Sequence, residues 1–139
     1  MDTNATTDGD VKAIKRLGEE YFAATNAGDP DRCWAVMATD VIIMPPDRPS
    51  IVGKGEIRRL FHDYHATYEL NYTLVYDEAE MAGNSGFARA TVTGTRTSKS
   101  GGGVEKVSWK SLWIVKRQAD GKWEFWRIMF NGTTPPQTS

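Results

Sequence analysis

The stretch YFAATNAGDPDRCWAVMATDVIIMPPD, residues 21–47, decides how the chain is organised. Its first residues complete a helical spacing of apolar side chains, which predicts a helix over 10–27. Gly28 favours the left-handed conformation just past a helix end. Asp29 can then cap a second helix, over 30–38, because proline is well suited to the first helical position.

The segments after this helical pair become strand-like. The run VIIM at 41–44 is typical of a buried strand, and the prolines that follow stop it. A further apolar face at helical spacing predicts a third helix over 55–67. Beyond it the period of the apolar residues becomes two, and clusters rich in Gly, Asn, Asp and Ser separate the runs. Four strands are expected there, over 70–81, 86–98, 103–117 and 122–131.

This order of elements predicts an α+β fold. Neighbouring strands joined by short turns pair antiparallel, and the helices that precede them pack on one face of the sheet. A sheet that curls around its helices leaves room for a pocket between the two layers. With 139 residues, the chain can bury a core as one domain, which we expect over 10–131. The polar ends, over 1–9 and 132–139, are expected to be disordered.

The charge balance excludes several classes of partner. The chain has seventeen Lys and Arg residues and eighteen Asp and Glu residues, so no strong field attracts nucleic acid or a membrane surface.

The N-terminal residues have no apolar core of a signal peptide, and no run is long enough to span a bilayer. Cys33 is the single cysteine and cannot form an internal disulfide. We therefore expect a cytoplasmic protein.

The order of elements and three motifs resemble the nuclear transport factor 2-like superfamily, and within it the SnoaL-like group. The motifs are YFAATNAGD at the end of the first helix, VGKGEIRRLF at the start of the third and DGKWEFWRIMFN in the last strand. The resemblance covers residues 10–131. It implies a cystatin-like cone, in which three N-terminal helices pack on a strongly curved, mainly antiparallel sheet. It also implies an internal cavity and a homodimer formed through the outer face of the sheet.

The resemblance implies a choice between two functions. The superfamily includes ketosteroid isomerases, polyketide cyclases, epoxide hydrolases and dehydratases, and also binding or assembly modules without catalysis. A small, mostly apolar organic ligand in the cavity is therefore expected, with acid/base chemistry of the isomerase or cyclase type and no cofactor. The alternative is a non-catalytic dimeric binding or assembly module. Fold alone does not decide between them.

Comparison with the ketosteroid isomerase pattern retains one of its three parts. By the register of YFAATNAGD, Tyr21 corresponds to the tyrosine that donates a hydrogen bond to a developing oxyanion. The position of the carboxylate base falls on Pro45, which cannot accept a proton. The position of the protonated acidic donor falls near Ser111. Steroid isomerisation by that mechanism is therefore not expected.

Two other side chains are candidates for the missing base. Asp47 follows two prolines and is either a turn residue or a base at the rim of the pocket. His65 lies at the edge of the apolar face of the third helix, from which an imidazole can reach a cavity mouth. His62 points away from that face, and no third ligand follows at metal spacing, so no metal site is expected. Cys33 has no evident activating neighbour and is interpreted as an inert core residue.

The last strand is apolar on both faces, so both faces of the sheet must be covered. One cover is the helix layer, and the other is expected to be a second copy of the chain. If the isomerase register holds, Trp126 faces the cavity and Arg127 faces the dimer side. In the other register Arg127 lies inside as an anion anchor, and the sequence leaves both open. The expected ligand-binding residues are Trp34, Met44, Phe61, Ser111, Trp113, Trp126, Ile128 and Phe130.

Overall fold

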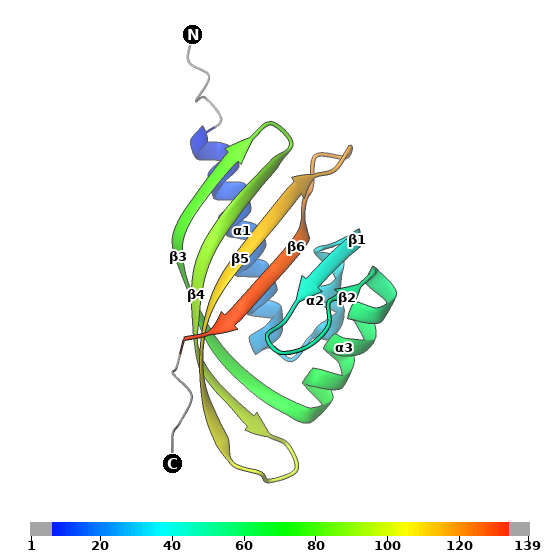
Figure 1. The fold of residues 1–139 in the computed structure, drawn as a ribbon, viewed down its shortest axis with the longest axis vertical. Helices are drawn as coiled ribbons and strands as arrows, with labels where there is room; N and C mark the ends of the chain where they lie inside the picture. The colour runs from blue at the N-terminus through cyan, green and yellow to red at the C-terminus, as the bar shows by residue number, and fades with distance from the viewer. Residues whose placement is uncertain (1–6, 134–139) are drawn as a thin grey trace.

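Three helices lie against one face of a curved sheet in the computed structural model, which describes residues 7–133 (Figure 1). The helices are α1 (Thr7–Asn26), α2 (Pro30–Ala35) and α3 (Lys54–Thr67). The strands are β1 (Met37–Met44), β2 (Ile51–Val52), β3 (Tyr68–Ala82), β4 (Ser85–Ser98), β5 (Val104–Arg117) and β6 (Trp123–Gly132). The predicted fold, a cystatin-like cone with three helices on a curved sheet, is confirmed.

The sheet is mainly antiparallel, as predicted. Its strand order is β2-β1-β6-β5-β4-β3. The three long pairings β3–β4, β4–β5 and β5–β6 are antiparallel, as is the short β1–β2 pairing. The exception is β1, which lies parallel to β6. This parallel pair brings the strand that follows α2 next to the end of the chain. The first and last parts of the domain thus meet in one sheet.

The observed boundaries differ from the predicted ones at a few places. Helix α1 begins at Thr7 and strand β6 ends at Gly132, each inside a segment expected to be disordered. The helix predicted over 30–38 ends at Ala35, and strand β1 begins four residues earlier than predicted, at Met37. The first residues of this strand are two apolar residues followed by two polar ones, which lack the apolar run of 41–44. The two-residue strand β2 is too short for any periodicity to predict. The rest of both predicted tails lies outside the described residues.

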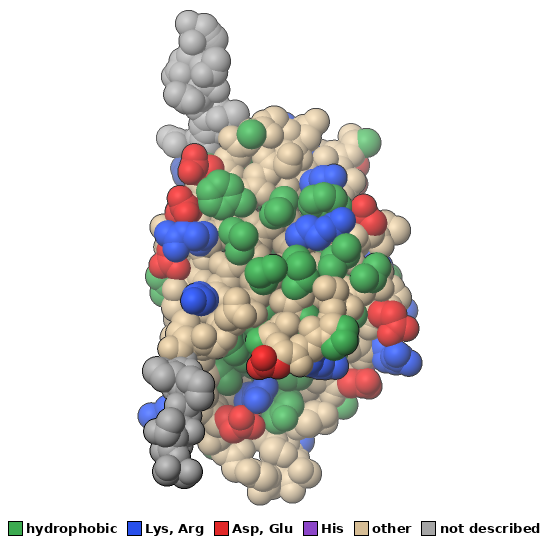
Figure 2. Space-filling model, viewed as in Figure 1, with side chains coloured by type: hydrophobic (Ala, Val, Ile, Leu, Met, Phe, Trp, Pro, Cys, Tyr) green, Lys and Arg blue, Asp and Glu red, His purple; other side chains and the backbone are tan. Residues whose placement is uncertain are grey.

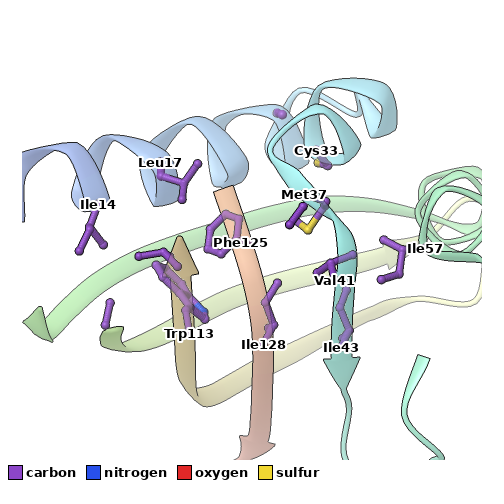
Figure 3. Close-up of a cluster of buried hydrophobic side chains, with 14 of the residues drawn as sticks. Ile14, Leu17, Cys33, Met37, Val41, Ile43, Ile57, Trp113, Phe125 and Ile128 are labelled. Carbon is purple, nitrogen blue, oxygen red and sulfur yellow. The ribbon is translucent and has the colours of Figure 1, made fainter. Parts of the chain in front are cut away.

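The core lies between α1 and the inner face of the sheet. Figure 3 shows Ile14 and Leu17 of α1 above Trp113 of β5 and Phe125 of β6. The same cluster continues to Met37 at the start of β1. All of these side chains are buried, so the contact of α1 with the sheet is dry along this stretch. Burial of this kind supplies most of the stability of a domain of this size.

Helix α1 approaches the sheet most closely at Gly18. A Cβ atom at this position would collide with the Tyr76 hydroxyl and lie 2.8 Å from a ring carbon of Trp113. The Tyr76 hydroxyl also donates a hydrogen bond to the Lys15 carbonyl, at 2.7 Å. Only glycine therefore allows this helix to rest on the two aromatic rings.

We predict that Gly18→Ala destabilises the protein although alanine is the better helix former. The added methyl group overpacks the contact with Tyr76, which costs about 1–3 kcal/mol and outweighs the roughly 1 kcal/mol that alanine contributes in a helix. Gly9→Ala is the matched control, since Gly9 lies in the same helix with no atom within 4 Å of the added Cβ. Chemical denaturation measures both variants, and equal effects of the two would contradict the close approach at Gly18.

Candidate functional site

A cavity of about 460 Å³ lies between the helices and the inner face of the sheet. Its wall is mostly apolar, with side chains from α1, α3, β1 and the long strands. Polar groups are few, and no Asp or Glu of residues 7–133 lines the cavity. A volume of this size falls in the range of small-molecule sites, roughly 300–1,000 Å³.

Seven of the predicted site residues line this cavity. They are Tyr21, Phe61, His65, Ser111, Trp113, Ile128 and Phe130. They come from α1, α3, β5 and β6, elements that extend from the start to the end of the domain. Four other predicted residues, Trp34, Met44, Asp47 and Trp126, do not line it.

Trp126 lies on the other side of the sheet because β6 contains a bulge. The pairing with β5 skips from Ile114–Arg127 to Val115–Phe125, which leaves Trp126 without a partner residue. A bulge of this kind shifts the alternation by one residue. Trp126 and Arg127 consequently both face away from the cavity, although Ile128 and Phe130 face it as the isomerase register predicts.

The outer position of Trp126 is held by charged neighbours. The Arg127 guanidinium lies 3.6 Å from the centre of its ring, and the Lys116 ammonium lies 3.8 Å from it. The indole N–H donates a hydrogen bond to Asp40, at 3.1 Å. Arg127 also donates to the Asp40 carbonyl, at 3.0 Å. Arg127 is therefore not an anion anchor inside the cavity.

Trp34, Met44 and Asp47 are excluded from the cavity for separate reasons. Trp34 lies between the short helix α2 and the start of α3, where its indole N–H donates to the Lys54 carbonyl at 2.9 Å. Met44 follows the inward-facing Ile43 and so points to the opposite side of β1. Asp47 lies in a turn with a φ of 59°, where its side chain is exposed and does not line the cavity.

His65 is the most unusual polar residue of the cavity. It is only 6% exposed. Its Nδ1 atom lies 2.9 Å from the Phe61 carbonyl, one helical turn earlier. A carbonyl only accepts hydrogen bonds, so Nδ1 carries a proton, and in the neutral ring Nε2 carries the lone pair. Nε2 is buried and has no hydrogen-bonding partner in the described chain.

Tyr21 supplies a hydrogen-bond donor on the α1 side of the cavity. Burial raises the pKa of its hydroxyl far above the ordinary value, with smaller contributions from Cys33 and Tyr64. Within residues 7–133 the hydroxyl forms no hydrogen bond, and the bonds from Thr25 and Cys33 go to the Tyr21 carbonyl. The phenol thus stays protonated and has its proton free for a ligand.

A pair of tyrosines that the sequence did not predict as site residues also lines the cavity, together with an arginine. The Tyr64 and Tyr72 hydroxyls lie 2.7 Å apart, and Arg96 donates to Tyr64 at 3.2 Å and to Glu105 at 3.1 Å. Two hydroxyl protons serve one hydroxyl–hydroxyl bond, so one proton is left over whichever tyrosine donates. Burial, followed by the bond to Tyr64, raises the pKa of Tyr72 well above its ordinary value.

A signal for this group was present in the strands. Tyr72 lies two residues after the buried Leu70, and Arg96 lies four residues after the buried Val92. In a strand, side chains at these spacings share one face, so both side chains are expected on the inner face of the sheet. The backbone of Tyr72 is clasped by the Asn26 side chain, which accepts from its N–H at 2.7 Å and donates to its carbonyl at 2.8 Å. This clasp places the end of α1 against the edge strand β3 and so positions the Tyr72 ring.

The remaining candidates lie outside the chemistry of the cavity. The His62 ring is 2.8 Å from Asp31 on the surface between α2 and α3. Burial raises the pKa of the Cys33 thiol to about 11, and its neighbours are Thr25 and the Tyr21 carbonyl. No group of three His, Cys, Asp or Glu residues within 7–133 is placed to hold a metal ion. Among the same residues, no helix is long and apolar enough to cross a membrane.

The comparisons with known proteins agree with this architecture. The family model of the SnoaL-like domain matches residues 19–126. The chain belongs to the SnoaL-like family. Its fold is that of the nuclear transport factor 2-like superfamily, as structural neighbours show that are ketosteroid isomerase-like and nuclear transport factor 2-like proteins. A comparison with curated proteins gives no match.

Three solved structures illustrate how widely this SnoaL-like fold is used. A ketosteroid isomerase-like protein from Erwinia carotovora atroseptica has a TM-score of 0.85 and 24% identity, covering 93% of this chain and 100% of the other. A candidate dehydratase of the NTF2-like family from Streptomyces avermitilis has a TM-score of 0.74 and 19% identity, covering 92% and 99%. A nuclear transport factor 2-like protein from Salmonella enterica serovar Typhimurium has a TM-score of 0.78 and 15% identity, covering 96% of each chain. Identities this low show the fold and not the activity.

Proposed function

We propose that this SnoaL-like protein is an enzyme that transfers a proton on a small, mostly apolar organic ligand. The observation that carries the proposal is the Nε2 lone pair of His65, which is buried beside an apolar cavity and has no partner within residues 7–133. A buried polar atom without a hydrogen bond is costly, so such atoms are rare outside functional sites. His65 thus takes the part of the base that the isomerase pattern gives to a carboxylate.

The two tyrosine groups supply the complementary part. A hydrogen-bond donor in a dry site stabilises the negative charge that forms on an oxygen in the transition state. Tyr21 has a free hydroxyl proton, and the Tyr64–Tyr72 pair has one more. Both groups remain neutral at ordinary pH because burial raises the pKa values of Tyr21 and Tyr72. The cavity therefore combines one base with two donors.

The proposed reaction is acid/base catalysis on an enolisable ligand. His65 Nε2 removes a proton from the carbon next to a carbonyl group, and the C–H electron pair moves to form an enolate. Tyr21 donates a hydrogen bond to the enolate oxygen. The His65 imidazolium then returns the proton, either to another carbon, which gives an isomer, or to a departing hydroxyl group, which leaves as water. The isomerase-like and candidate dehydratase neighbours of this fold support both outcomes at the level of reaction class.

A deuterium exchange assay tests the proton transfer without knowledge of the physiological substrate. We predict that the protein accelerates exchange of the acidic C–H protons of 2-tetralone with D₂O, measured by NMR. His65→Gln should reduce the protein-dependent rate about 100-fold or more, since a positioned base contributes 10²–10⁴. Tyr21→Phe should reduce it by roughly 10²-fold, as the loss of one oxyanion donor does.

The control variant for this assay lies on the same helix. His62→Gln removes a surface histidine that pairs with Asp31 outside the cavity, so the exchange rate should stay at the wild-type level. Thermal melts of all variants show whether the fold is intact. Exchange that is equal in the wild type and in folded His65→Gln would remove His65 from the chemistry.

The second candidate function is a non-catalytic binding module. The mostly apolar wall and the lack of a lining carboxylate within residues 7–133 favour it. Such a module binds ligands of the same class without changing them. Binding of 2-tetralone without any exchange above the buffer rate would support this function over catalysis.

We also infer that two copies of the chain associate through the outer face of the sheet. Figure 2 shows apolar side chains gathered on the sheet face that the helices leave uncovered. Val75, Leu112 and Met129 on β3, β5 and β6 are 55%, 42% and 42% exposed. Apolar patches of this kind on soluble domains mark interaction surfaces, and a self-complementary sheet face suits a two-fold dimer.

We predict that Leu112→Glu converts a dimer into a monomer, because a buried unpaired carboxylate opposes association. Light scattering coupled to size exclusion measures the mass. Ala23→Glu, which adds the same charge to the exposed side of α1, should leave the dimer intact. A wild-type protein that is monomeric at micromolar concentration would overturn the inference.

A further inference from the structure

The charged side chains that line the cavity are all cationic. Two guanidinium groups, Arg48 and Arg96, contribute to the wall, and no carboxylate of the described residues does so. Low-dielectric walls focus the field of such groups into the cavity. The electrostatic field of the site thus favours an anionic group on the ligand.

The two arginines differ in how their charge is balanced. Arg96 forms an ion pair with Glu105, with 3.1 Å between Nη2 and Oε2, and also donates to Tyr64. Its charge is compensated and it holds the tyrosine pair, while its buried Nε has no hydrogen-bonding partner within residues 7–133. Arg48 is exposed and forms no ion pair or hydrogen bond with any other residue of 7–133. Arg48 is therefore the cavity-lining cation whose charge has no counterion among the described residues.

The backbone around Arg48 is more constrained than its side chain. The loop PPDRP, residues 45–49, contains three prolines, each of which restricts its own backbone φ angle. Pro45 and Pro46 line the cavity together with Arg48. This arrangement anchors the arginine at the cavity wall while its guanidinium stays free to turn toward a ligand. A guanidinium recognises a carboxylate through two parallel hydrogen bonds.

We propose that the ligand is an organic acid, with an apolar body that fills the cavity and a carboxylate that Arg48 binds. The apolar wall suits the body, and the single uncompensated cation suits one negative charge. Binding of the carboxylate at Arg48 fixes one end of the ligand and so orients its other end along the wall that carries His65 and Tyr21. The inference rests on the proposed ligand-binding role of the cavity, and it requires no proton transfer.

Paired probes of equal shape test the role of the carboxylate. The probes are 1-naphthylacetate and its neutral amide, 1-naphthylacetamide, which share one apolar ring system. Calorimetry at low salt measures their binding, and fluorescence of Trp109 and Trp113, which line the cavity, reports it independently. The acid should bind about tenfold tighter than the amide, as expected for a hydrogen bond to a charged group. Added salt should weaken binding of the acid and leave the amide unaffected.

The variants assign this preference to one residue. Arg48→Gln should bring the two affinities to within about twofold of each other, because it removes the charge and leaves the apolar contacts. Arg16→Gln is the matched control, since Arg16 is an exposed arginine of α1 outside the cavity, and it should keep the full preference. Equal binding of acid and amide by the wild type overturns the proposal. A preference that persists in Arg48→Gln, or failure of both probes to bind, overturns it as well.

One further variant separates this inference from the proposed catalysis. His65→Gln should retain the preference for the acid, although it reduces deuterium exchange on 2-tetralone about 100-fold or more. Loss of the preference in His65→Gln would contradict the assignment to Arg48. A protein that prefers the acid but exchanges no protons supports the ligand class and refutes the enzyme.

Discussion

The hydrogen bond between His65 and the Phe61 carbonyl determines what the cavity can do. It is formed within one turn of α3, at 2.9 Å, and it commits the Nδ1 proton to the helix backbone. In the neutral ring this leaves the lone pair on Nε2, which has no partner in residues 7–133. Without this bond the imidazole could turn or change tautomer, and the cavity would hold donors but no base. In the proposed function, the tyrosines, the arginines and the apolar wall bind and orient a ligand beside this nitrogen.

Helix α1 makes this arrangement possible because its contact with the sheet changes along its length. At Gly18, α1 rests directly on Tyr76 and Trp113 and leaves no space. At Tyr21, about one turn further along, the same helix faces the cavity. The Asn26 clasp on the backbone of Tyr72 ties the end of the helix to the edge strand. One helix therefore packs directly on the sheet at Gly18 and forms part of the cavity wall about one turn later, at Tyr21.

The sequence predicted the parts of the fold and site that depend on local pattern. The helical spacing around Tyr21 and the apolar face that includes Phe61 placed both side chains in the cavity wall. The bulge that turns Trp126 outward was not predictable, because it depends on how β6 pairs with β5 and not on β6 itself. The Tyr64–Tyr72 pair joins a helix to a strand, so its geometry also depends on tertiary packing. The same holds for Arg48, whose position follows from the short strand β2 and its loop.

The protonation of His65 is the most direct test of this account. Nitrogen-15 NMR of the imidazole rings distinguishes a protonated nitrogen from one with a lone pair, and His65→Gln assigns the signals. We predict that the neutral His65 ring carries its proton on Nδ1 and its lone pair on Nε2, and that addition of 1-naphthylacetate leaves the Nδ1 proton in place. A ring with its proton on Nε2 would contradict the account, because the cavity would then contain no base.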